Sequence, residues 1–311
     1  MNQPETLQEA IVYFANKTVA HDYLVSVRWG NGIVCPHCKG KEHSYISTRK
    51  IWKCKSCKKQ FSVKAGTIFE ASPVGLDKWF SVVWMIANSK NGISSCEISR
   101  AIGVTQKTAW FMLHRIRQAM KSGSFEKLSG EVEIDETYFG GEARNMHYGK
   151  REVSGRGSVG KTIVVGLLER NGNARITTPR NAKKKTLQKI IRAEVEKGSE
   201  IFTDAFASYN GLETEYIHSI IDHATAYVNG NVHTNGIENF WSLFKRTMRG
   251  TYIYCNPSHL FRYLDEQTFR FNNRKTTDSN RFALALNGIQ NKRIMYRQLI
   301  AHHTPKQLTL F

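Results

Sequence analysis

Acidic residues and long apolar runs are both scarce in this 311-residue sequence. It has 26 Asp and Glu against 45 Lys and Arg, a formal net charge of +19. The longest apolar run, from Phe80 to Ala87 and broken only by Ser81, is far too short to cross a bilayer. The polar start MNQPETLQEA does not predict a secretory signal. Because 41% apolar and 11% aromatic residues exclude general disorder, we expect a folded protein. Its excess of positive charge predicts a cytoplasmic protein whose partner is a polyanion, nucleic acid before membrane.

The positive charge is unevenly distributed along the chain. Residues 131–250 carry 17 basic and 15 acidic side chains, so this block is close to neutral, whereas the two flanks hold the remaining net charge of +17. A block that keeps its carboxylates inside a basic protein is where metal chemistry is expected, since carboxylate oxygens are ligands for hard divalent cations.

Four of the six cysteines form two CxxC pairs, Cys35 with Cys38 and Cys54 with Cys57. Fifteen residues separate the pairs, which is the spacing of a four-cysteine zinc site. Disulfides and a redox CxxC are the competing interpretations. A reducing compartment argues against disulfides, and a redox site would need only one CxxC pair. We expect a zinc ribbon with one structural Zn2+, since four protein ligands leave zinc no open position for catalysis.

Basic side chains crowd the same hairpin, with six of them within eleven residues. A charge run is usually a solvated face, but on a metal-bound hairpin it is more plausibly a surface that follows DNA phosphates. The residues in this run are Arg49, Lys50, Lys53, Lys55, Lys58 and Lys59, of which Arg49, Lys50 and Lys58 are the predicted DNA contacts.

Helix-period segments follow the ribbon at residues 76–88, 95–102 and 106–121. Gly103 makes the turn before the last segment and Thr105 caps it, an order typical of a helix-turn-helix unit. A plain three-helix packing unit remains the alternative. The residues predicted to face outward and to reach bases or phosphates are Gln106, Lys107, Arg115 and Arg117.

From Gly130 the apolar period changes from that of a helix to that of a strand. Three consecutive strands, a helix over about 186–197, a further strand and a later helix predict an RNase H-like domain in an α/β (α+β) multidomain protein. Asp135 would lie on the first strand, Asp204 at the end of the fourth strand and Glu238 on the later helix.

These three acids suggest a site for two divalent ions. Two strand carboxylates and one helical carboxylate that converge can hold ions a few ångströms apart and support in-line attack at phosphorus. Mg2+, or Mn2+, suits such oxygen ligands. Glu133 alternates onto the face of Asp135 while Glu136 points away, so Glu136 is the poorer candidate. Asp204 as a helix N-cap and Glu238 as a first-turn acid are the simpler interpretations.

The stretch 155–162, GRGSVGKT, fits the phosphate-loop pattern letter for letter. A phosphate loop needs a buried strand before it and a helix after it, whereas here a polar segment precedes it and a strand-like one follows. The basic residues around it are better interpreted as a loop that grips DNA beside the active site; these are Arg144, Lys150, Arg151, Arg156 and Lys161.

Several independent motifs now carry a family resemblance. The segments EIDETYFGG, FTDAFASYN and HTNGIENFWSLFKR, together with the two CxxC motifs and GISSCEISRAIGVTQKTAWFMLHRIRQAM, resemble the DDE transposases of bacterial insertion sequences, in the ISXO-type group that bears a zinc ribbon. The resemblance covers residues 28–274. It implies that Asp135, Asp204 and Glu238 form the metal-binding triad and that Lys245, seven residues after Glu238, lies near the DNA end.

The resemblance implies a DNA transposase that binds terminal inverted repeats, hydrolyses a phosphodiester at the element ends and joins the 3′-OH to target DNA. We expect a homodimer or a larger synaptic complex bound to double-stranded DNA. We expect neither a membrane partner nor the use of ATP. A DNA-binding regulator on an inactive scaffold and a related nuclease or resolvase are the alternatives. The expected segments are a helical N-terminus (1–28), the ribbon (29–69), the helix-turn-helix (70–128), the catalytic domain (129–250) and a basic helical tail (251–311).

Overall fold

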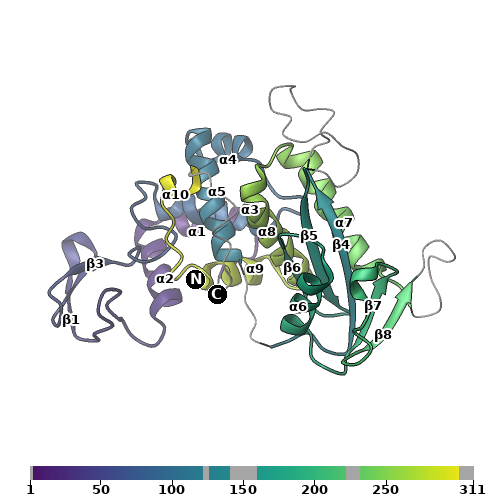
Figure 1. Cartoon of the computed structure of the whole chain (residues 1–311). Helices are drawn as coiled ribbons and strands as arrows, with labels where there is room; N and C mark the ends of the chain where they lie inside the picture. The colour runs from purple at the N-terminus through teal and green to yellow at the C-terminus, as the bar shows by residue number, and fades with distance from the viewer. Residues whose placement is uncertain (1–2, 122–125, 141–159, 222–231, 301–311) are drawn as a thin grey trace. The chain divides into compact units, whose positions relative to one another are not determined.

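The computed structural model describes residues 3–121, 126–140, 160–221 and 232–300. The chain divides into two compact units, Met1–Ser122 with Asn273–Phe311, and Gly123–Asn272, so the second unit is inserted into the first. Figure 1 shows their elements coloured along the chain. The expected tail is divided between the units, because residues 251–272 belong to the inserted unit and 273–300 to the N-terminal one.

The N-terminal unit combines helices with a small sheet of order β1-β2-β3. Its elements are α1 (Leu7–Ala15), α2 (Lys17–Trp29), β1 (His43–Ile46), η1 (Ser47–Arg49), β2 (Ile51–Cys54), β3 (Gln60–Ser62), α3 (Leu76–Asn88), α4 (Ser95–Ile102), α5 (Gln106–Met120), α9 (Asp278–Asn287) and α10 (Tyr296–Ile300).

An aromatic core holds the helices of this unit together. The ring of Phe80 in α3 lies 4.7 Å from Phe14 of α1 and 6.0 Å from Phe282 of α9, and Trp84 lies 5.1 Å from Phe282. All four side chains are buried, and aromatic residues provide the largest apolar areas for burial. The helix α9, near the C-terminus, is therefore part of the core built by the first helices.

The inserted unit is a five-stranded mixed sheet with helices. Its elements are β4 (Glu131–Phe139), β5 (Thr162–Glu169), β6 (Ala174–Thr177), α6 (Lys184–Glu194), β7 (Glu200–Asp204), η4 (Ala207–Tyr209), β8 (Ile217–Ile221), α7 (Asn235–Thr247), η5 (Met248–Tyr252), η6 (Pro257–His259) and α8 (Leu260–Asn272). The order β6-β5-β4-β7-β8 places the first strand at the centre, antiparallel to β5 and parallel to β7. This is the predicted RNase H-like architecture.

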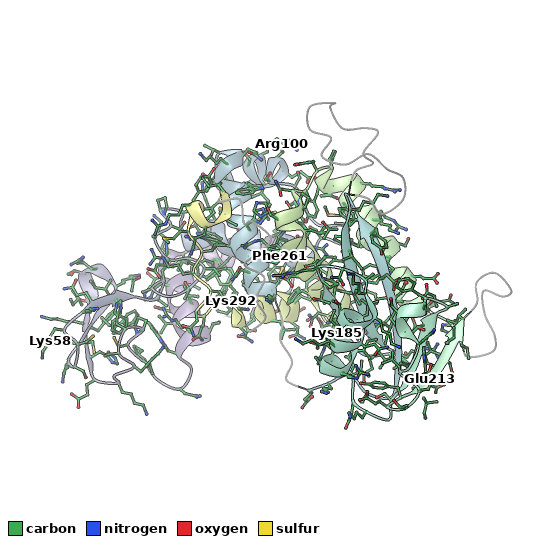
Figure 2. All side chains as sticks on the ribbon, viewed as in Figure 1. Lys58, Arg100, Lys185, Glu213, Phe261 and Lys292 are labelled. Atoms are coloured by element: carbon green, nitrogen blue, oxygen red, sulfur yellow. The ribbon has the colours of Figure 1, made fainter. Side chains whose placement is uncertain are left out.

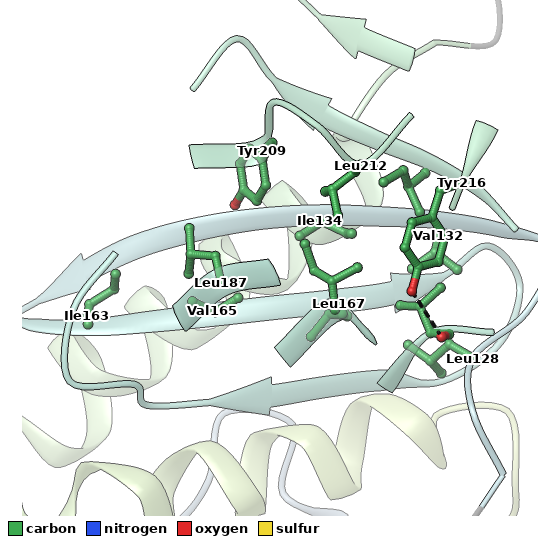
Figure 3. Packing of buried hydrophobic residues seen from close by; sticks show 13 residues of the cluster. Leu128, Val132, Ile134, Ile163, Val165, Leu167, Leu187, Tyr209, Leu212 and Tyr216 are labelled. Carbon is green, nitrogen blue, oxygen red and sulfur yellow. Dashed lines mark hydrogen bonds between the residues drawn. The ribbon is translucent and has the colours of Figure 1, made fainter. Parts of the chain in front are cut away.

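Side chains of the sheet alternate between two apolar layers. Ile134, Val165 and Leu167 pack with Leu187 and Ile191 of α6 (Figure 3). On the other layer Val164 and Leu168 pack with helices α7 and α8, whose buried residues include Ile237, Phe240, Trp241 and Leu264. Because β5 is covered on both faces, it reads as the continuous apolar run TIVVGLL.

The helix α6 begins and ends earlier than predicted. It spans Lys184–Glu194 rather than about 186–197, and Val195 has an extended backbone. Val195 instead forms a parallel bridge with Leu128, three residues before β4, so its extended backbone does not continue the helix. Strand β8, which the sequence analysis did not anticipate, pairs in parallel with β7.

Candidate active site

The four predicted zinc ligands cluster in the N-terminal unit. The sulfur atoms of Cys35 and Cys57 are 3.7 Å apart, those of Cys38 and Cys54 are 3.6 Å apart, and all four lie within 4.8 Å of one another. Tetrahedral zinc with Zn–S bonds of about 2.3 Å separates its sulfur ligands by about 3.8 Å. The donor set therefore fits one zinc ion and leaves it no open position.

The backbone around the cysteines is adapted to this cluster. A Cβ at Gly40 would lie 2.9 Å from Ser56 Oγ and 3.4 Å from Cys38 Sγ, so glycine lets this backbone lie close to the sulfur atoms without displacing the Ser56 side chain. A backbone hydrogen bond from Cys57 is the main cause that lowers the pKa of the Cys54 thiol to about 6. The thiolate, which is the form that binds metal, is thereby favoured at neutral pH.

Most basic residues of the ribbon are exposed, as Figure 2 shows for Lys58. Arg49 is exposed and donates to Gln60 Oε1 at 3.3 Å. Lys50 is half-buried, and its Nζ donates to Thr18 Oγ1 at 2.7 Å. Their contact with DNA stays a prediction.

Helices α4 and α5 lie at the predicted positions. Ser94 caps α4 in a capping box with Glu97, Gly103 takes a left-handed φ of 62° at its end, and Thr105 caps α5. Gln106 and Lys107 are exposed, as predicted; the Gln106 amide donates to Ser95 Oγ at 2.7 Å, and Lys107 Nζ lies 4.7 Å from the Tyr296 ring.

The prediction that Arg115 and Arg117 face outward is wrong. Their exposed fractions are 3% and 1%. The Arg115 guanidinium donates to the carbonyl oxygens of Ile68 at 2.8 Å, Glu70 at 2.9 Å and Ile294 at 3.0 Å. It therefore joins three segments of the N-terminal unit to one another rather than reading DNA.

The three predicted catalytic acids come from three elements of the inserted unit. The parallel register of β4 with β7 pairs Glu131 with Glu200 and Glu133 with Phe202. Extended by two residues, that register aligns Asp135 with Asp204, which ends β7. Side chains at aligned positions of neighbouring strands project to the same face.

Each carboxylate has a hydrogen-bond donor that orients it. Trp241 Nε1 of α7 donates to Asp135 Oδ2 at 3.0 Å, and the backbone N–H of Phe206 donates to Asp204 Oδ1 at 3.2 Å. Thr234 Oγ1 donates to Glu238 Oε1 at 2.9 Å. Asp204 is not the N-cap of η4, because that position is Phe206. Glu238 does lie in the first turn of α7, as the simpler interpretation also expected.

The three acids interact electrostatically. Burial first, and then the negative charges of Asp204 and Glu238, raise the pKa of Asp135 to about 6 despite the Trp241 hydrogen bond. Among the described residues the four cysteines are the one group of His, Cys, Asp or Glu side chains whose ligand atoms gather as for a metal ion, so ion binding by the three carboxylates stays a prediction.

Glu136 points away from Asp135, as its strand alternation predicts, but it belongs to the same electrostatic cluster. The buried Tyr209 hydroxyl donates to Glu136 Oε2. Burial first, and then the charges of Asp204 and Asp135, raise the pKa of Glu136 to about 7. A partner as distant in sequence as Tyr209 leaves no local pattern by which it could have been predicted.

Glu133 of β4 holds the start of α7 through a hydrogen bond. Its side chain is 1% exposed, accepts from the Ile237 backbone N–H at 2.9 Å and pairs with Arg170 Nε at 3.0 Å. Arg170 also donates to the His233 carbonyl at 2.8 Å. The residue pair thus fixes the backbone on both sides of Thr234, whose hydroxyl holds Glu238.

Glycine permits α7 to approach the sheet closely. A Cβ at Gly166 of β5 would lie 2.6 Å from Ile237 Cδ1 and 2.7 Å from Trp241 Cζ2. A Cβ at Gly236 would lie 2.7 Å from Glu133 Oε2. These two glycines explain how a helical carboxylate and an indole donor reach the strand that carries Asp135.

Most of the glycine-rich stretch 155–162 lies outside the described residues, as do Arg144, Lys150, Arg151 and Arg156. Thr162 opens strand β5, so a strand and not a helix follows Lys161, as predicted. The helix that a phosphate loop requires is therefore not at this position.

Family models match both parts of the chain. A zinc-ribbon domain of transposases matches residues 16–60, and an ISXO2-like transposase domain matches residues 127–272. The second range contains all three acids.

Relatives from two organisms agree with the family models. A transposase-like protein of Haemophilus influenzae is 37% identical over 94 residues, which cover 30% of this chain and 76% of that protein. The chain belongs to the ISXO2-like transposase family. A protein in the transposable element ISH50 of Halobacterium salinarum is 29% identical to this transposase over 248 residues, which cover 75% of the chain and 83% of the relative.

Among solved structures, the transposase aligns with a chain of the Mos1 strand transfer complex at 13% identity and a TM-score of 0.27. The alignment covers 67% of the transposase and 78% of the Mos1 chain. A chain of a pre-cleavage Mos1 transpososome aligns at 12% identity with the same TM-score and coverage. In the described part of the transposase, no helix is long and apolar enough to cross a membrane.

Proposed function

We propose that this DNA transposase cleaves the ends of its own insertion element and joins them to target DNA, using Asp135, Asp204 and Glu238. The observation that carries the proposal is the register that aligns Asp135 with Asp204, together with the hydrogen bond from Ile237 to Glu133 that ties the helix bearing Glu238 to the same strand. Burial first, and then the charges of Asp204 and Glu238, raise the pKa of Asp135. Clustered carboxylates repel one another until a cation neutralises them. A divalent cation bound there would polarise the phosphate and lower the pKa of an attacking water.

The residues of the chain prepare two successive transfers at phosphorus. Asp135 and Asp204 present oxygen ligands from adjacent strands, and Glu238, held by Thr234, orients the attacking water. Water attacks the phosphorus at the element end and the P–O3′ bond breaks, which releases a 3′-OH. That oxygen then attacks a target phosphorus and displaces a target 3′ oxygen, so the number of phosphodiester bonds is conserved in the second transfer.

The N-terminal unit would recognise the terminal inverted repeats. Gln106 and Lys107 at the start of α5 are exposed, and Arg49, Lys50 and Lys58 of the ribbon can contact phosphates. Lys245, exposed on α7, would hold the phosphates of the end being cut. Because an element has two ends, we propose that at least two copies assemble on DNA, without ATP.

Strand transfer with labelled duplexes that carry the terminal repeat tests the proposal. The wild type with Mg2+ or Mn2+ should nick the end and join it to a target plasmid, while Asp135→Asn, Asp204→Asn and Glu238→Gln should each lose at least about a thousandfold, in line with the loss of essential metal ligands. Glu200→Gln, at the opposite end of β7, is the matched control.

Normal joining by Asp135→Asn would contradict the assignment of the triad. Cut ends that are released without joining would instead indicate a nuclease of the resolvase kind. Binding without any metal-dependent nicking would indicate a regulator on an inactive scaffold.

A further inference from the structure

Two apolar side chains project into solvent just beyond the helix that carries Glu238. Ile253 is 81% exposed and Tyr254 is 76% exposed, the highest values of any large apolar side chain in the described part of the chain. Single exposed apolar residues are ordinary, but two adjacent ones this exposed are unfavourable in water unless something covers them.

The backbone holds this pair in an unusual conformation. Ile253 has φ 61° and ψ −51°, a positive φ that a β-branched residue adopts only as an outlier. Its N–H donates to the Met248 carbonyl at 2.7 Å and closes the wide turn η5, which continues α7. Such wide helical turns and such outliers cluster at functional sites.

A rigid support lies beneath the exposed pair. The hydroxyl of Tyr252 donates to Glu266 Oε1 at 2.5 Å, and its ring centroid lies 4.8 Å from that of Tyr263. Glu266 is fully buried in α8. The exposed pair is therefore fixed on the unit that carries the three acids.

A row of exposed polar residues leads from the active site to this pair. Glu238, Ser242 and Lys245 follow one another at spacings of four and three, which places them along one side of α7, and Arg249 follows in η5; all four are exposed. With a rise of at most about 1.5 Å per residue, Ile253 lies no more than about 22 Å from Glu238 along the axis. The positive charges of Lys245 and Arg249, which lie between these two residues, complement the phosphates of DNA.

We propose that Ile253 and Tyr254 pack against an unstacked base of the DNA end, within about six nucleotides of the bond that is cut, given about 3.4 Å per nucleotide along a strand. Lys245 and Arg249 hold the phosphates between, Tyr254 stacks on the base and Ile253 fills the gap left in the stack. This inference rests on the proposed function, since it takes the cut bond to lie beside Glu238.

Base unstacking is tested with 2-aminopurine placed in turn at each of the ten positions around the cleavage site of a terminal-repeat duplex. Wild-type protein should raise the fluorescence several-fold at one or two positions within six nucleotides of the cut. Ile253→Ala/Tyr254→Ala should abolish this rise and weaken end binding about tenfold, in line with the loss of one stacked base. Ile217→Ala, on β8 and 63% exposed, is the matched control and should behave as the wild type.

The outcomes separate this inference from the proposed function. A wild type that cuts and joins but raises no fluorescence, or a double variant that retains the full rise, overturns the inference alone. A change in oligomeric state on sedimentation, with fluorescence unchanged, assigns the pair to contact between two copies and also overturns it. A wild type that binds the end but never nicks it contradicts the proposed function, whatever the fluorescence.

Discussion

The buried carboxylate of Glu133 in β4 accepts a hydrogen bond of 2.9 Å from the backbone N–H of Ile237 in α7. The helix that carries Glu238 is thereby tied to the strand that carries Asp135. A carboxylate near a helix N-terminus also interacts favourably with the helix dipole. The position of Glu238 therefore depends on a residue that takes no part in the chemistry.

Glu133→Gln should reduce both stability and cleavage. The amide keeps an acceptor for Ile237 but leaves the Arg170 guanidinium without its buried partner, which costs about 3 kcal/mol of unfolding free energy. Denaturant unfolding of Glu133→Gln, Arg170→Met and the double variant measures the coupling. The double variant should lose less than the two single losses combined, and strictly additive losses would contradict the pairing.

Gly166→Ala should disturb the contact between α7 and β5. The new methyl group would meet Ile237 and Trp241 at under 3 Å, and overpacking of this kind costs about 1–3 kcal/mol. Since Trp241 holds Asp135, cleavage should fall as well. The control is Gly250→Ala, where the added Cβ meets nothing within 4 Å. Equal melting temperatures for the two variants would argue against close packing at Gly166.

The metal-free protein should become less stable as the pH rises from about 5 to 8. Burial raises the pKa of Asp135 from 3.8 to about 6 and that of Glu136 from 4.5 to about 7. Between the ordinary and the raised values the folded state binds more protons than the unfolded state, so the stabilisation present below pH 4 is lost as the pH rises through 6 and 7.

Melting temperatures in a chelating buffer check this pH dependence. The Asp135→Asn/Glu136→Gln variant should give a flatter profile between pH 5 and 8 than the wild type, whereas Glu200→Gln should not. A double variant with the slope of the wild type would show that other groups cause the dependence.

Arg115→Met should lower stability, whereas Lys107→Met should weaken DNA binding. Arg115 satisfies carbonyl groups from Ile68, Glu70 and Ile294, so its loss should lower the unfolding free energy by about 2–3 kcal/mol. Lys107 is exposed, so its loss should leave stability nearly unchanged and lower the salt dependence of end binding by about one phosphate contact. Thermal unfolding and gel-shift titrations at several salt concentrations distinguish the two.

Zinc removal should unfold the ribbon and leave the inserted unit folded. Cys38→Ser breaks the four-sulfur set, so released zinc, measured with a chromogenic chelator, should fall well below one equivalent. Binding of terminal-repeat DNA should weaken, while the far-ultraviolet circular dichroism should retain the contribution of the folded inserted unit. Cys255→Ser, a cysteine outside the cluster, is the control.

Regular patterns in the sequence predicted most of the architecture and the positions of Asp135, Asp204 and Glu238. The change from helical to strand period at Gly130 located β4 and β5 because both are long and strongly apolar. The same kind of reasoning failed at Arg115 and Arg117. Amphipathic patterns place charged residues outward, but a guanidinium can be buried when backbone carbonyls from distant loops satisfy it.

The supporting residues of the site were also beyond sequence reasoning. Alternation correctly placed Glu133 on the face of Asp135, yet the backbone N–H that it binds belongs to Ile237, more than a hundred positions later. Partners such as Trp241 and Tyr209 likewise come together only once the sheet and its helices are packed.

The insertion of one unit into the other has a consequence for biosynthesis. Phe282, which completes the aromatic core around Phe80, emerges from the ribosome only after the entire catalytic unit has been translated. A nonsense codon or frameshift anywhere between the two halves would therefore leave the N-terminal unit without its closing helix. Under the proposed function, truncated products of the gene would compete poorly for the element ends, so the fold itself would restrict dominant-negative fragments.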